Sequence, residues 1–358
     1  MSQTVFILGA GASVNAGAPL MKDFLDIAEG LLVRNEVEDS VAEFKLVFKA
    51  ISALTQAHSK ATLDLINIES TFAAFEMGKL LGRLGTFSAE EIDRLPESMR
   101  KVIVRTLEKS VKIPVVNERA QAPTPYPRLT DLMIQVFQKR RNGWEDLAKM
   151  FSIITFNYDL CLDLTFHFAD VPVKYHLDDV QAQEAISISV LKLHGSLNWG
   201  RCSACEKLVA WPLAKYFQNR LWLPGTTSRL LEISQRTRDF QHCNSGAFTG
   251  PYVVPPTWNK GQYHNSLESV WKAAASELAS AENIFVSGYS LPESDHFFRY
   301  LYALGTIGEL RVKRFWVFDP DSKVEQRFRS LLGQAVLPNF HFFAGNFYEM
   351  FGEIVKLF

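Results

Sequence analysis

The chain opens with a short apolar run that is followed at once by glycines, and this stretch limits the possible folds more than any other. Val5–Leu8 (VFIL) is rich in β-formers, which is typical of a strand buried on both faces. Gly9-Ala10-Gly11-Ala12-Ser13 comes next and leads into a segment that can form a helix. A strand that turns through glycines into a helix presents backbone N–H groups at the helix N-terminus, where phosphate binds. The stretch therefore predicts a parallel α/β sheet with a phosphate site at its first turn.

A plainer interpretation of the glycines stays open. The full dinucleotide fingerprint has a third glycine three residues after Gly11, where this chain has Val14. An ordinary tight turn between a strand and a helix uses small residues as well. We favour nucleotide binding because the turn directly follows a hydrophobic strand, which is the context of such fingerprints.

Composition excludes several classes of protein. The 358 residues allow one large α/β domain with insertions or two smaller domains. Lys and Arg number 38 and Asp and Glu 39, so no net field attracts nucleic acid or an anionic membrane. The 4 cysteines favour a reducing compartment over a disulfide scaffold. Because no apolar run is long enough for a membrane span and no signal peptide is evident, we expect a cytoplasmic protein without direct nucleic-acid binding.

Helix-like apolar spacing dominates the first part of the chain after the glycine turn. It predicts helices over Met21–Arg34, Val41–Leu54, Glu69–Leu84, Ala89–Lys109 and Arg128–Lys139. Strands and helices alternate again from Phe151 onward. We therefore expect an α/β fold in which residues 1–34 and 151–358 form a Rossmann-like parallel sheet. A helical insertion is expected over 35–150, and a small Cys-containing module over 198–256.

Polar or glycine-bearing signatures follow five of the predicted strands. They read GAGAS (9–13), TFNYD (155–159), HGS (194–196), GYSLP (288–292) and FDPD (318–321). The last four follow strands expected near Ile153–Ile154, Ile186–Leu193, Ile284–Ser287 and Phe315–Phe318. Ligands bind outside the carboxyl ends of the strands in open parallel sheets, so the five signatures predict one shared crevice.

In this order, and with a Cys-x-x-Cys module after HGS, the motifs resemble the sirtuin (silent information regulator) family. The resemblance implies a sirtuin-type Rossmann domain that uses NAD, with Asn157 and His194 as the catalytic residues and His194 as the general base. It implies that the glycine turn binds the pyrophosphate and that Asp159 lies near the nicotinamide ribose. Gly288 and Ser290 are expected to meet ribose and phosphate, and Asp319 the adenosine half. The implied NAD-binding set is Gly9, Ala10, Gly11, Ala12, Ser13, Asp159, Gly288, Ser290 and Asp319.

The chemistry of these side chains suits cleavage of the nicotinamide–ribose bond. The transition state is oxocarbenium-like, so the reaction needs a nucleophile on one face and a held leaving group on the other. His194 can take a proton near neutral pH, Asn157 can position water or ribose hydroxyls, and Asp159 can orient the carboxamide. Plainer interpretations exist: Asn157 and Asp159 are also turn formers, and Asp319-Pro-Asp321 can simply begin the next helix.

Two departures separate the chain from the deacylases of that family. Gly17-Ala-Pro19 continues as Leu20-Met21-Lys22, without the Phe-Arg pair of the deacylases. Pro251–Trp258 (PYVVPPTW) stands in place of their peptide-pairing strand, and prolines cannot donate to a ladder. The chain is in this respect similar to a prokaryotic branch that hydrolyses NAD in antiphage defence, sometimes beside a partner ATPase or nuclease.

Three functions follow as hypotheses. The first is an NAD glycohydrolase that takes NAD as substrate and releases nicotinamide and ADP-ribose. The second is an NAD-dependent protein deacylase, and the third a nucleotide-sensing subunit with little turnover. Because constant NAD cleavage is toxic, we expect the hydrolase to be inhibited at rest, by homo-oligomer formation or by a partner.

The cysteines leave a structural zinc site open and assign no metal to the catalytic residues. Cys202 and Cys205 form one Cys-x-x-Cys pair, whereas the second pair retains only Cys243, with Gly246 at its partner position. His242 is a poor substitute because adjacent residues rarely ligate one ion. Five of the 7 tryptophans, Trp199, Trp211, Trp222, Trp258 and Trp271, are expected to pack in the core or at interfaces rather than to stack on nucleic acid. Cys161 is expected to be a small core residue.

Overall fold

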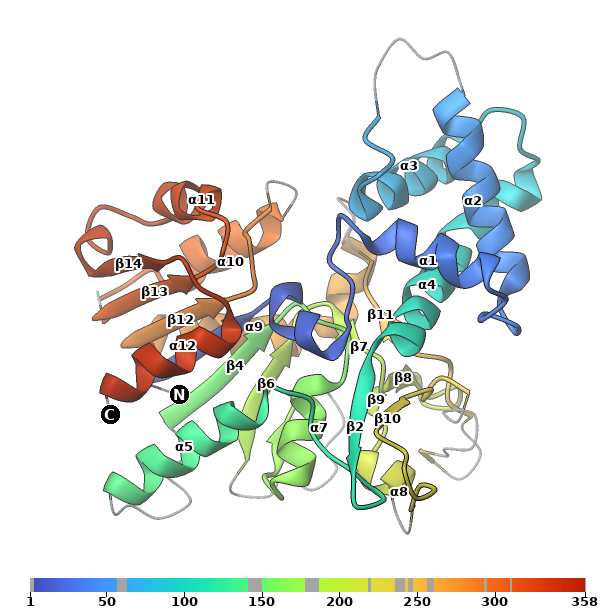
Figure 1. The fold of residues 1–358 in the computed structure, drawn as a ribbon. Coiled ribbons are helices and arrows are strands. Elements are labelled where there is room, and N and C mark those ends of the chain that lie inside the picture. The colour runs from blue at the N-terminus through green and yellow to red at the C-terminus, as the bar shows by residue number, and fades with distance from the viewer. Residues whose placement is uncertain are drawn as a thin grey trace.

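A seven-stranded parallel sheet is the centre of the protein. The computed structural model describes residues 3–56, 63–140, 150–177, 187–217, 220–235, 242–243, 247–255, 261–292, 295–309 and 311–357. The sheet has the order β14-β13-β12-β1-β4-β6-β5 (Figure 1). Its strands are β1 (Thr4–Leu8), β4 (Phe151–Thr155), β5 (Val173–Lys174), β6 (Ile188–Lys192), β12 (Asn283–Ser287), β13 (Arg314–Phe318) and β14 (Phe340–Phe343). The predicted α/β class with a parallel sheet is confirmed.

Burial of both sheet faces explains why the central strands are nearly all apolar. All five residues of β1, β4, β6 and β12 are buried. One face is covered by α5 (Pro127–Arg140), α7 (Cys161–Phe168) and α12 (Phe347–Ile354), and the other by α9 (Gly261–Ser280), α10 (His296–Gly305) and α11 (Lys323–Leu331). Alternate residues of β1 serve the two faces: Phe6 and Leu8 pack toward α5, Val5 and Ile7 toward α9.

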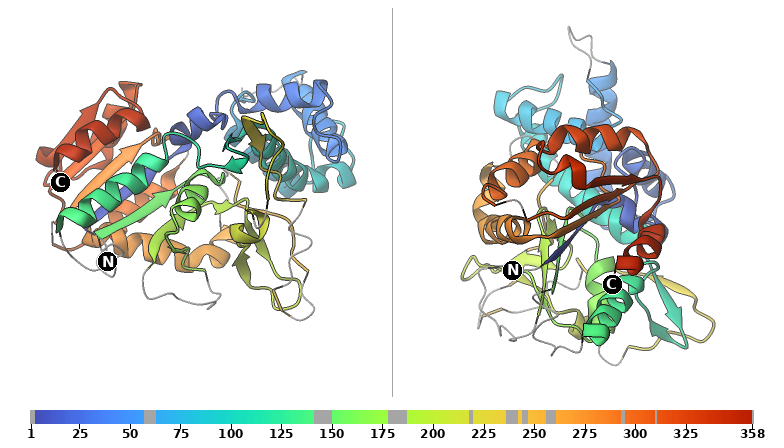
Figure 2. Two further views of the ribbon diagram at one scale, coloured as in Figure 1. Left: turned by 60° about the horizontal axis from the view of Figure 1, so that its bottom comes forward. Right: turned by 90° about the vertical axis from the view of Figure 1, so that its left-hand side faces the viewer.

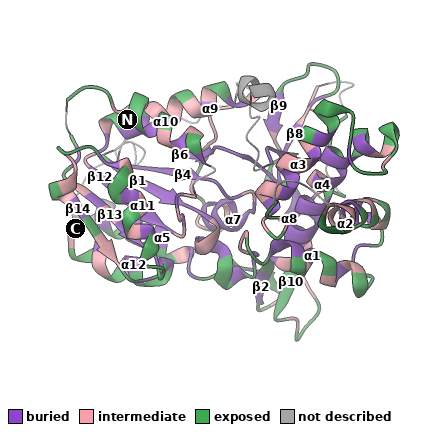
Figure 3. Cartoon of the chain, turned by 90° about the horizontal axis from the view of Figure 1, so that it is seen from above, coloured by how far each residue is buried: buried purple, intermediate pink, exposed green. Residues whose placement is uncertain are grey.

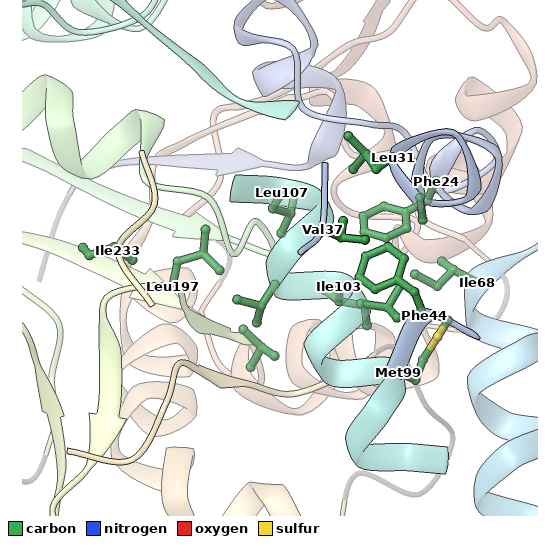
Figure 4. Close-up of a cluster of buried hydrophobic side chains, with 14 of the residues drawn as sticks. Phe24, Leu31, Val37, Phe44, Ile68, Met99, Ile103, Leu107, Leu197 and Ile233 are labelled. Carbon is green, nitrogen blue, oxygen red and sulfur yellow. The ribbon is translucent and has the colours of Figure 1, made fainter. Parts of the chain in front are cut away.

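The helical block consists of α1 (Phe24–Val33), α2 (Val41–Gln56), α3 (Ile68–Leu81) and α4 (Ala89–Ser110). Ser88 begins α4 with a capping box to Glu91, and the helix continues through Pro96. Phe44, Met99 and Ile103 lie at the centre of the apolar core that joins these helices (Figure 4). Views from two further directions place this block beyond the carboxyl ends of the sheet strands (Figure 2).

Residues of the Cys-containing segment divide between two apolar cores: Val209 and Trp211 belong to the core of the helices, whereas Trp199 and Leu208 belong to the core on the α9 face of the sheet. Leu197, directly before that segment, and Ile233 within it belong to the same buried cluster as the four helices, and both appear in the close-up with Leu107 (Figure 4). β7 (Gly195–Ser196) precedes the segment, whose own elements are β8 (Trp199–Arg201), β9 (Leu208–Ala210), α8 (Leu213–Phe217), β10 (Ser228–Leu230) and β11 (Tyr252–Val253). β10 pairs with β2 (Lys112–Val116), which pairs with β3 (Arg119–Ala120). We call the helices and this segment together the helical lobe.

Two helices, α1 and α5, lie near the two ends of the expected helical insertion (residues 35–150). α1, within the first 34 residues, packs in the core of the helical lobe. α5, before residue 150, packs on the sheet through Leu129, Leu132 and Met133. We call the seven-stranded sheet with α5, α7 and α9–α12 the sheet lobe, and the burial map shows a buried interior in it and in the helical lobe (Figure 3). The division of the chain into domains stays a prediction.

The predicted helices and strands agree with the structure to within a few residues. The first turn differs: it continues as a 3₁₀ helix, η1 (Ala10–Ala16), which stops at Gly17 with φ 91°. β2, β3, β8, β9, α7 and α8 were not predicted, because they are short and lack a clear apolar period. Ile186 and Trp258 lie outside the described residues.

Candidate functional site

The five signatures meet at one edge of the sheet. They follow β1, β4, β6, β12 and β13, which are adjacent in the sheet and all parallel. The register pairs Leu8 with Thr155 and with Ser287, and Thr155 with Lys192. The signatures therefore begin within two residues of one level of the sheet, on strands that lie about 4.8 Å from their neighbours.

The glycine turn packs against the turn after β12. A Cβ added to Gly9 would lie 2.4 Å from the Gly288 carbonyl oxygen, and one on Gly11 would lie 2.7 Å from the Gly288 Cα. Gly288 has φ 65°, and its own Cβ would lie 2.2 Å from the Ala12 nitrogen. Glycine is thus required here because two backbones touch, a different reason from the phosphate approach that the sequence suggested.

Several amides of this turn already have protein partners. Gly9 donates to the Ser287 carbonyl at 3.1 Å, and Gly11 donates to the Gly288 carbonyl at 2.9 Å. Ala12 donates to the Gly9 carbonyl at 2.9 Å. A phosphate at this edge must therefore be held by donors other than these three.

Asn157 is tied to the glycine turn. Its Nδ2 donates to the Gly9 carbonyl at 2.9 Å and to Ser13 Oγ at 3.2 Å, and its backbone N–H donates to Thr155 Oγ1 at 3.1 Å. The side chain is buried. Since both N–H groups of the amide point into the protein, Oδ1 is the atom that Asn157 presents as an acceptor.

Tyr126 completes this group, and the sequence analysis missed it. It precedes α5, is fully buried, and its hydroxyl lies 2.7 Å from Ser13 Oγ. Burial and the nearby Asp159 carboxylate raise the pKa of Tyr126 far above its ordinary value, so the phenol stays neutral. Burial and Asp159 likewise raise the pKa of the Cys161 thiol, which agrees with its expected role as a core residue. Tyr126 carries no local signal because its partners are distant in sequence.

Asp159 turns toward a helix. Its Oδ1 accepts a hydrogen bond of 3.0 Å from the Cys161 N–H at the start of α7, and its carboxylate is buried. Its backbone carbonyl accepts from the Lys192 ammonium at 2.7 Å. The geometry is that of a turn former, as the plainer interpretation anticipated. A contact of Asp159 with the nicotinamide ribose stays a prediction.

His194 lies against the aromatic residues on either side of Asn157. Its ring centroid is 5.3 Å from that of Phe156 and 6.2 Å from that of Tyr158. The His194 carbonyl accepts from the Val254 N–H at 2.8 Å, and the residue is buried. Phe156 in turn stacks on Tyr289, with centroids 4.0 Å apart, so a row of rings links the ends of β6, β4 and β12.

The loop after β12 and the turn after β13 lie at the same carboxyl edge of the sheet. The Ser290 carbonyl accepts from Arg327 at 3.1 Å, and the Tyr289 hydroxyl donates to Asp295 at 2.6 Å. Asp319 Oδ1 accepts from the Asp321 N–H at 2.8 Å, the turn geometry that favours entry into α11. Burial raises the pKa of Asp319. Its role toward adenosine stays a prediction.

Three cysteines and one histidine come together in the helical lobe. Cys202 Sγ is 3.4 Å from Cys243 Sγ, and Cys205 Sγ is 3.4 Å from His242 Nδ1. All four donor atoms lie within 4.8 Å of one another. A tetrahedral zinc ion sets its sulfur and nitrogen ligands about 3.5–3.8 Å apart, so this set fits zinc.

His242, judged a poor substitute from sequence, supplies the fourth donor because the chain turns sharply between His242 and Cys243; Gly246 lies outside the described residues. Backbone N–H groups of Cys205 and Ala204 lower the pKa of the Cys202 thiol to about 6, which favours the thiolate that zinc prefers. A hydrogen bond with Cys202 raises the pKa of Cys243.

Four of these five tryptophans lie among the described residues, and all four pack in or against the apolar clusters. Trp199 and Trp211 are buried, and Trp222 and Trp271 pack at the margins of the two large apolar clusters. Among the described residues, no helix combines the length and the apolar character of a membrane span.

Comparisons with known proteins give a distant structural likeness. No protein-family model and no curated protein matches this chain. Similar solved structures include a mutant Sir2 homologue in complex with ADP-ribose (16% identity, TM-score 0.43), covering 99% of this chain and 90% of that one. A Sir2 homologue–NAD complex (15%, TM-score 0.42) covers 99% and 88%, and Sir2Tm bound to a propionylated peptide (12%, TM-score 0.40) covers 99% and 92%.

Proposed function

We propose that this protein hydrolyses the nicotinamide–ribose bond of NAD and releases nicotinamide and ADP-ribose. One observation carries the proposal: Asn157 and His194 stand at the ends of neighbouring parallel strands, each two residues beyond the paired Thr155 and Lys192. Asn157 is also bonded to the glycine turn that is expected to bind the dinucleotide. A general base and a polar positioning group thus adjoin the predicted NAD site.

In this reaction His194 acts as the general base. Water attacks the ribose C1′, its proton passes to the His194 imidazole, and the C1′–N bond breaks with its electron pair going to nicotinamide. The Asn157 Oδ1 accepts a hydrogen bond from the attacking water or from a ribose hydroxyl, because its Nδ2 is committed to Gly9 and Ser13. The aromatic rings beside His194 limit the access of bulk water.

NAD binding is assigned along the same edge. We place the pyrophosphate at Gly9–Ser13, the ribose beside Asp159, Gly288 and Ser290, and the adenosine half toward Asp319. Since Gly9, Gly11 and Ala12 donate within the protein, this assignment requires other donors for the phosphates.

Hydrolysis is favoured over deacylation by the segment that lies at His194. β11 is already paired with β7, the Val254 N–H donates to the His194 carbonyl, and the Val254 carbonyl accepts from Tyr158 at 2.7 Å. A substrate peptide that added a strand here would compete with these bonds. The absence of the Phe-Arg pair after Pro19 supports the same choice.

We further propose that the enzyme is a cytoplasmic, NAD-depleting effector of antiphage defence that is inactive at rest. The helical block has no part in the catalytic scheme above, and it suits contact with a second copy or with a partner ATPase or nuclease. NAD turnover that changes steeply with protein concentration would support self-association. Constant, high turnover by a dilute monomer would contradict it.

The decisive experiment incubates the protein with NAD, with and without an acetyl-lysine peptide, and quantifies nicotinamide and ADP-ribose by chromatography. We expect release without peptide, and a loss of at least about 100-fold in Asn157→Ala and His194→Ala. His341→Ala, an exposed histidine on β14, is the matched control. Release that requires the peptide would indicate a deacylase. NAD binding without release at every protein concentration tested would indicate a sensing subunit, whereas release at only some concentrations would indicate a hydrolase that is inhibited at rest.

A further inference from the structure

We propose that Lys192 is a positioning residue that fixes the Asn157 loop relative to the strand that carries His194. The inference rests on the proposed function and adds a residue to it. Lys192 lies two residues before His194 on β6, and its ammonium reaches the loop after β4 that contains Asn157. One side chain therefore spans the two strand ends on which the reaction depends.

The contacts of the ammonium are short and fully enclosed. Lys192 Nζ donates to the Asp159 carbonyl at 2.7 Å and to Asp163 Oδ2 at 2.7 Å. The Lys192 side chain is 1% exposed and the Asp163 side chain is not exposed at all. Because no solvent competes with these bonds, they fix the Asp159 carbonyl, and with it the chain two residues after Asn157.

Asp163 is itself held from a third direction. Its Oδ1 accepts from the Tyr175 hydroxyl at 2.5 Å, and the Tyr175 ring meets the Trp199 ring edge-on at a centroid distance of 5.4 Å. Asp163 belongs to α7, Tyr175 follows β5, and Lys192 belongs to β6. The orientation of the ammonium is thus set by three separate elements.

Stability alone does not account for a lysine at this position. The two preceding residues on the same face of β6, Ile188 and Val190, are apolar and buried in the cluster beneath α7. Replacing a buried ion pair with apolar residues of similar volume is often neutral or stabilising. A pair of apolar residues in place of Lys192 and Asp163 would provide no hydrogen-bond donor for the Asp159 carbonyl. We therefore explain the lysine by its role in positioning the loop that contains Asn157.

The test separates placement from stability by comparing Lys192→Met with the double variant Lys192→Met/Asp163→Leu. Measurements are the melting temperature, kcat and KM for NAD, and amide hydrogen exchange over residues 156–161. The single variant is expected to melt lower, because Asp163 is left buried and unpaired. The double variant is expected to regain most of the melting temperature, to keep KM within about threefold, and to remain about 10–100-fold lower in kcat with faster exchange in the loop.

Controls keep the outcomes distinct. Lys313→Met/Glu282→Leu removes an exposed ion pair near the opposite edge of the sheet and should leave kcat unchanged. Tyr175→Phe removes the hydroxyl that donates to Asp163 and is expected to lower kcat about 3–10-fold at constant KM. This variant still tests the inference if both Lys192 variants fail to fold.

Recovery of kcat together with melting temperature in the double variant would overturn the inference. If the unaltered protein cleaves no NAD, the proposed function fails. Amide hydrogen exchange over residues 156–161 then tests, without any activity measurement, whether Lys192 fixes the loop that contains Asn157. Faster exchange in the double variant supports the role of Lys192, and unchanged exchange refutes it.

Discussion

Two buried ion pairs, one in each lobe, differ in how they are enclosed. Lys192–Asp163 lies under the strand ends of the sheet lobe and is sealed from solvent. Arg105–Glu108, on α4 of the helical lobe, has Glu108 fully buried, but Arg105 continues to Asp39 and Glu232, whose side chains are 47% and 32% exposed. The first pair is confined to the neighbourhood of the candidate site, whereas the second reaches the surface.

The hydrogen-bond partners of Asp163 and Glu108 show which parts of the protein each ion pair holds together. Asp163 accepts from Lys192 and Tyr175, and the same lysine fixes the Asp159 carbonyl of the site loop. Glu108 accepts from the Ser234 N–H and hydroxyl, both at 2.7 Å, and from Arg105 at 3.2 Å. The pair in the helical lobe therefore joins α4 to the Cys-containing segment, and we assign it to assembly of that lobe rather than to catalysis.

The largest test of this contrast is Glu108→Ala. The change removes the buried acceptor of the hydrogen bonds from the Ser234 N–H, the Ser234 hydroxyl and Arg105, while Arg105 keeps Asp39 and Glu232. We therefore expect a loss of about 3 kcal/mol in the free energy of unfolding, measured in urea. In the fraction that stays folded, kcat for NAD should be unchanged. Glu353→Ala, which breaks an exposed pair with Lys356, is the control and should change stability by less than about 1 kcal/mol. Equal effects of the two substitutions would show that the Arg105–Glu108 pair contributes no more than an exposed pair, and a lowered kcat in folded Glu108→Ala would abolish the distinction between the two buried pairs.

Removal of the metal tests a second structural element of the helical lobe, the cluster of three cysteines and His242. We expect about one zinc ion per chain by elemental analysis, and a melting temperature several degrees lower after chelation or in Cys205→Ser, since the ion joins Cys202 to the sharp turn at His242 and Cys243. Cys161→Ser alters a cysteine outside the cluster and should retain the metal. Metal-free protein with an unchanged melting temperature on chelation would rule out a structural ion.

The smallest expected effect is a pH dependence. Burial raises the pKa of Glu108 above its ordinary value, so the folded protein holds this proton more tightly than the unfolded chain does. Its contribution to stability is complete below the ordinary carboxyl pKa and is lost as pH rises through the raised pKa. Glu108→Gln should remove this decline, seen as a shallower fall of the unfolding free energy as pH rises above the ordinary carboxyl pKa of about 4.3. An identical slope in both proteins would show that Glu108 does not titrate in this range.

Much of the sheet lobe was predictable because its signals are local. Runs such as Val5–Leu8 indicate buried strands wherever they occur, and a polar signature after a parallel strand must lie at the carboxyl edge of the sheet. The convergence of Asn157, His194 and the glycine turn at that edge follows from this rule once the strands are adjacent. Side-chain orientation did not follow: Asp159 faces α7, and Asp319 holds its own turn.

The sequence by itself determined the α/β class, the positions of the long helices and strands, and the polar residues that follow the strands, because each depends on neighbours a few positions apart. Only the tertiary structure decided that Tyr126 supports Ser13, that Lys192 reaches the Asn157 loop, and that His242 joins three cysteines. These pairings connect residues far apart in the chain or on separate elements. They arise when packing brings those elements together and buried polar atoms must find partners, a requirement with no periodic trace in the sequence.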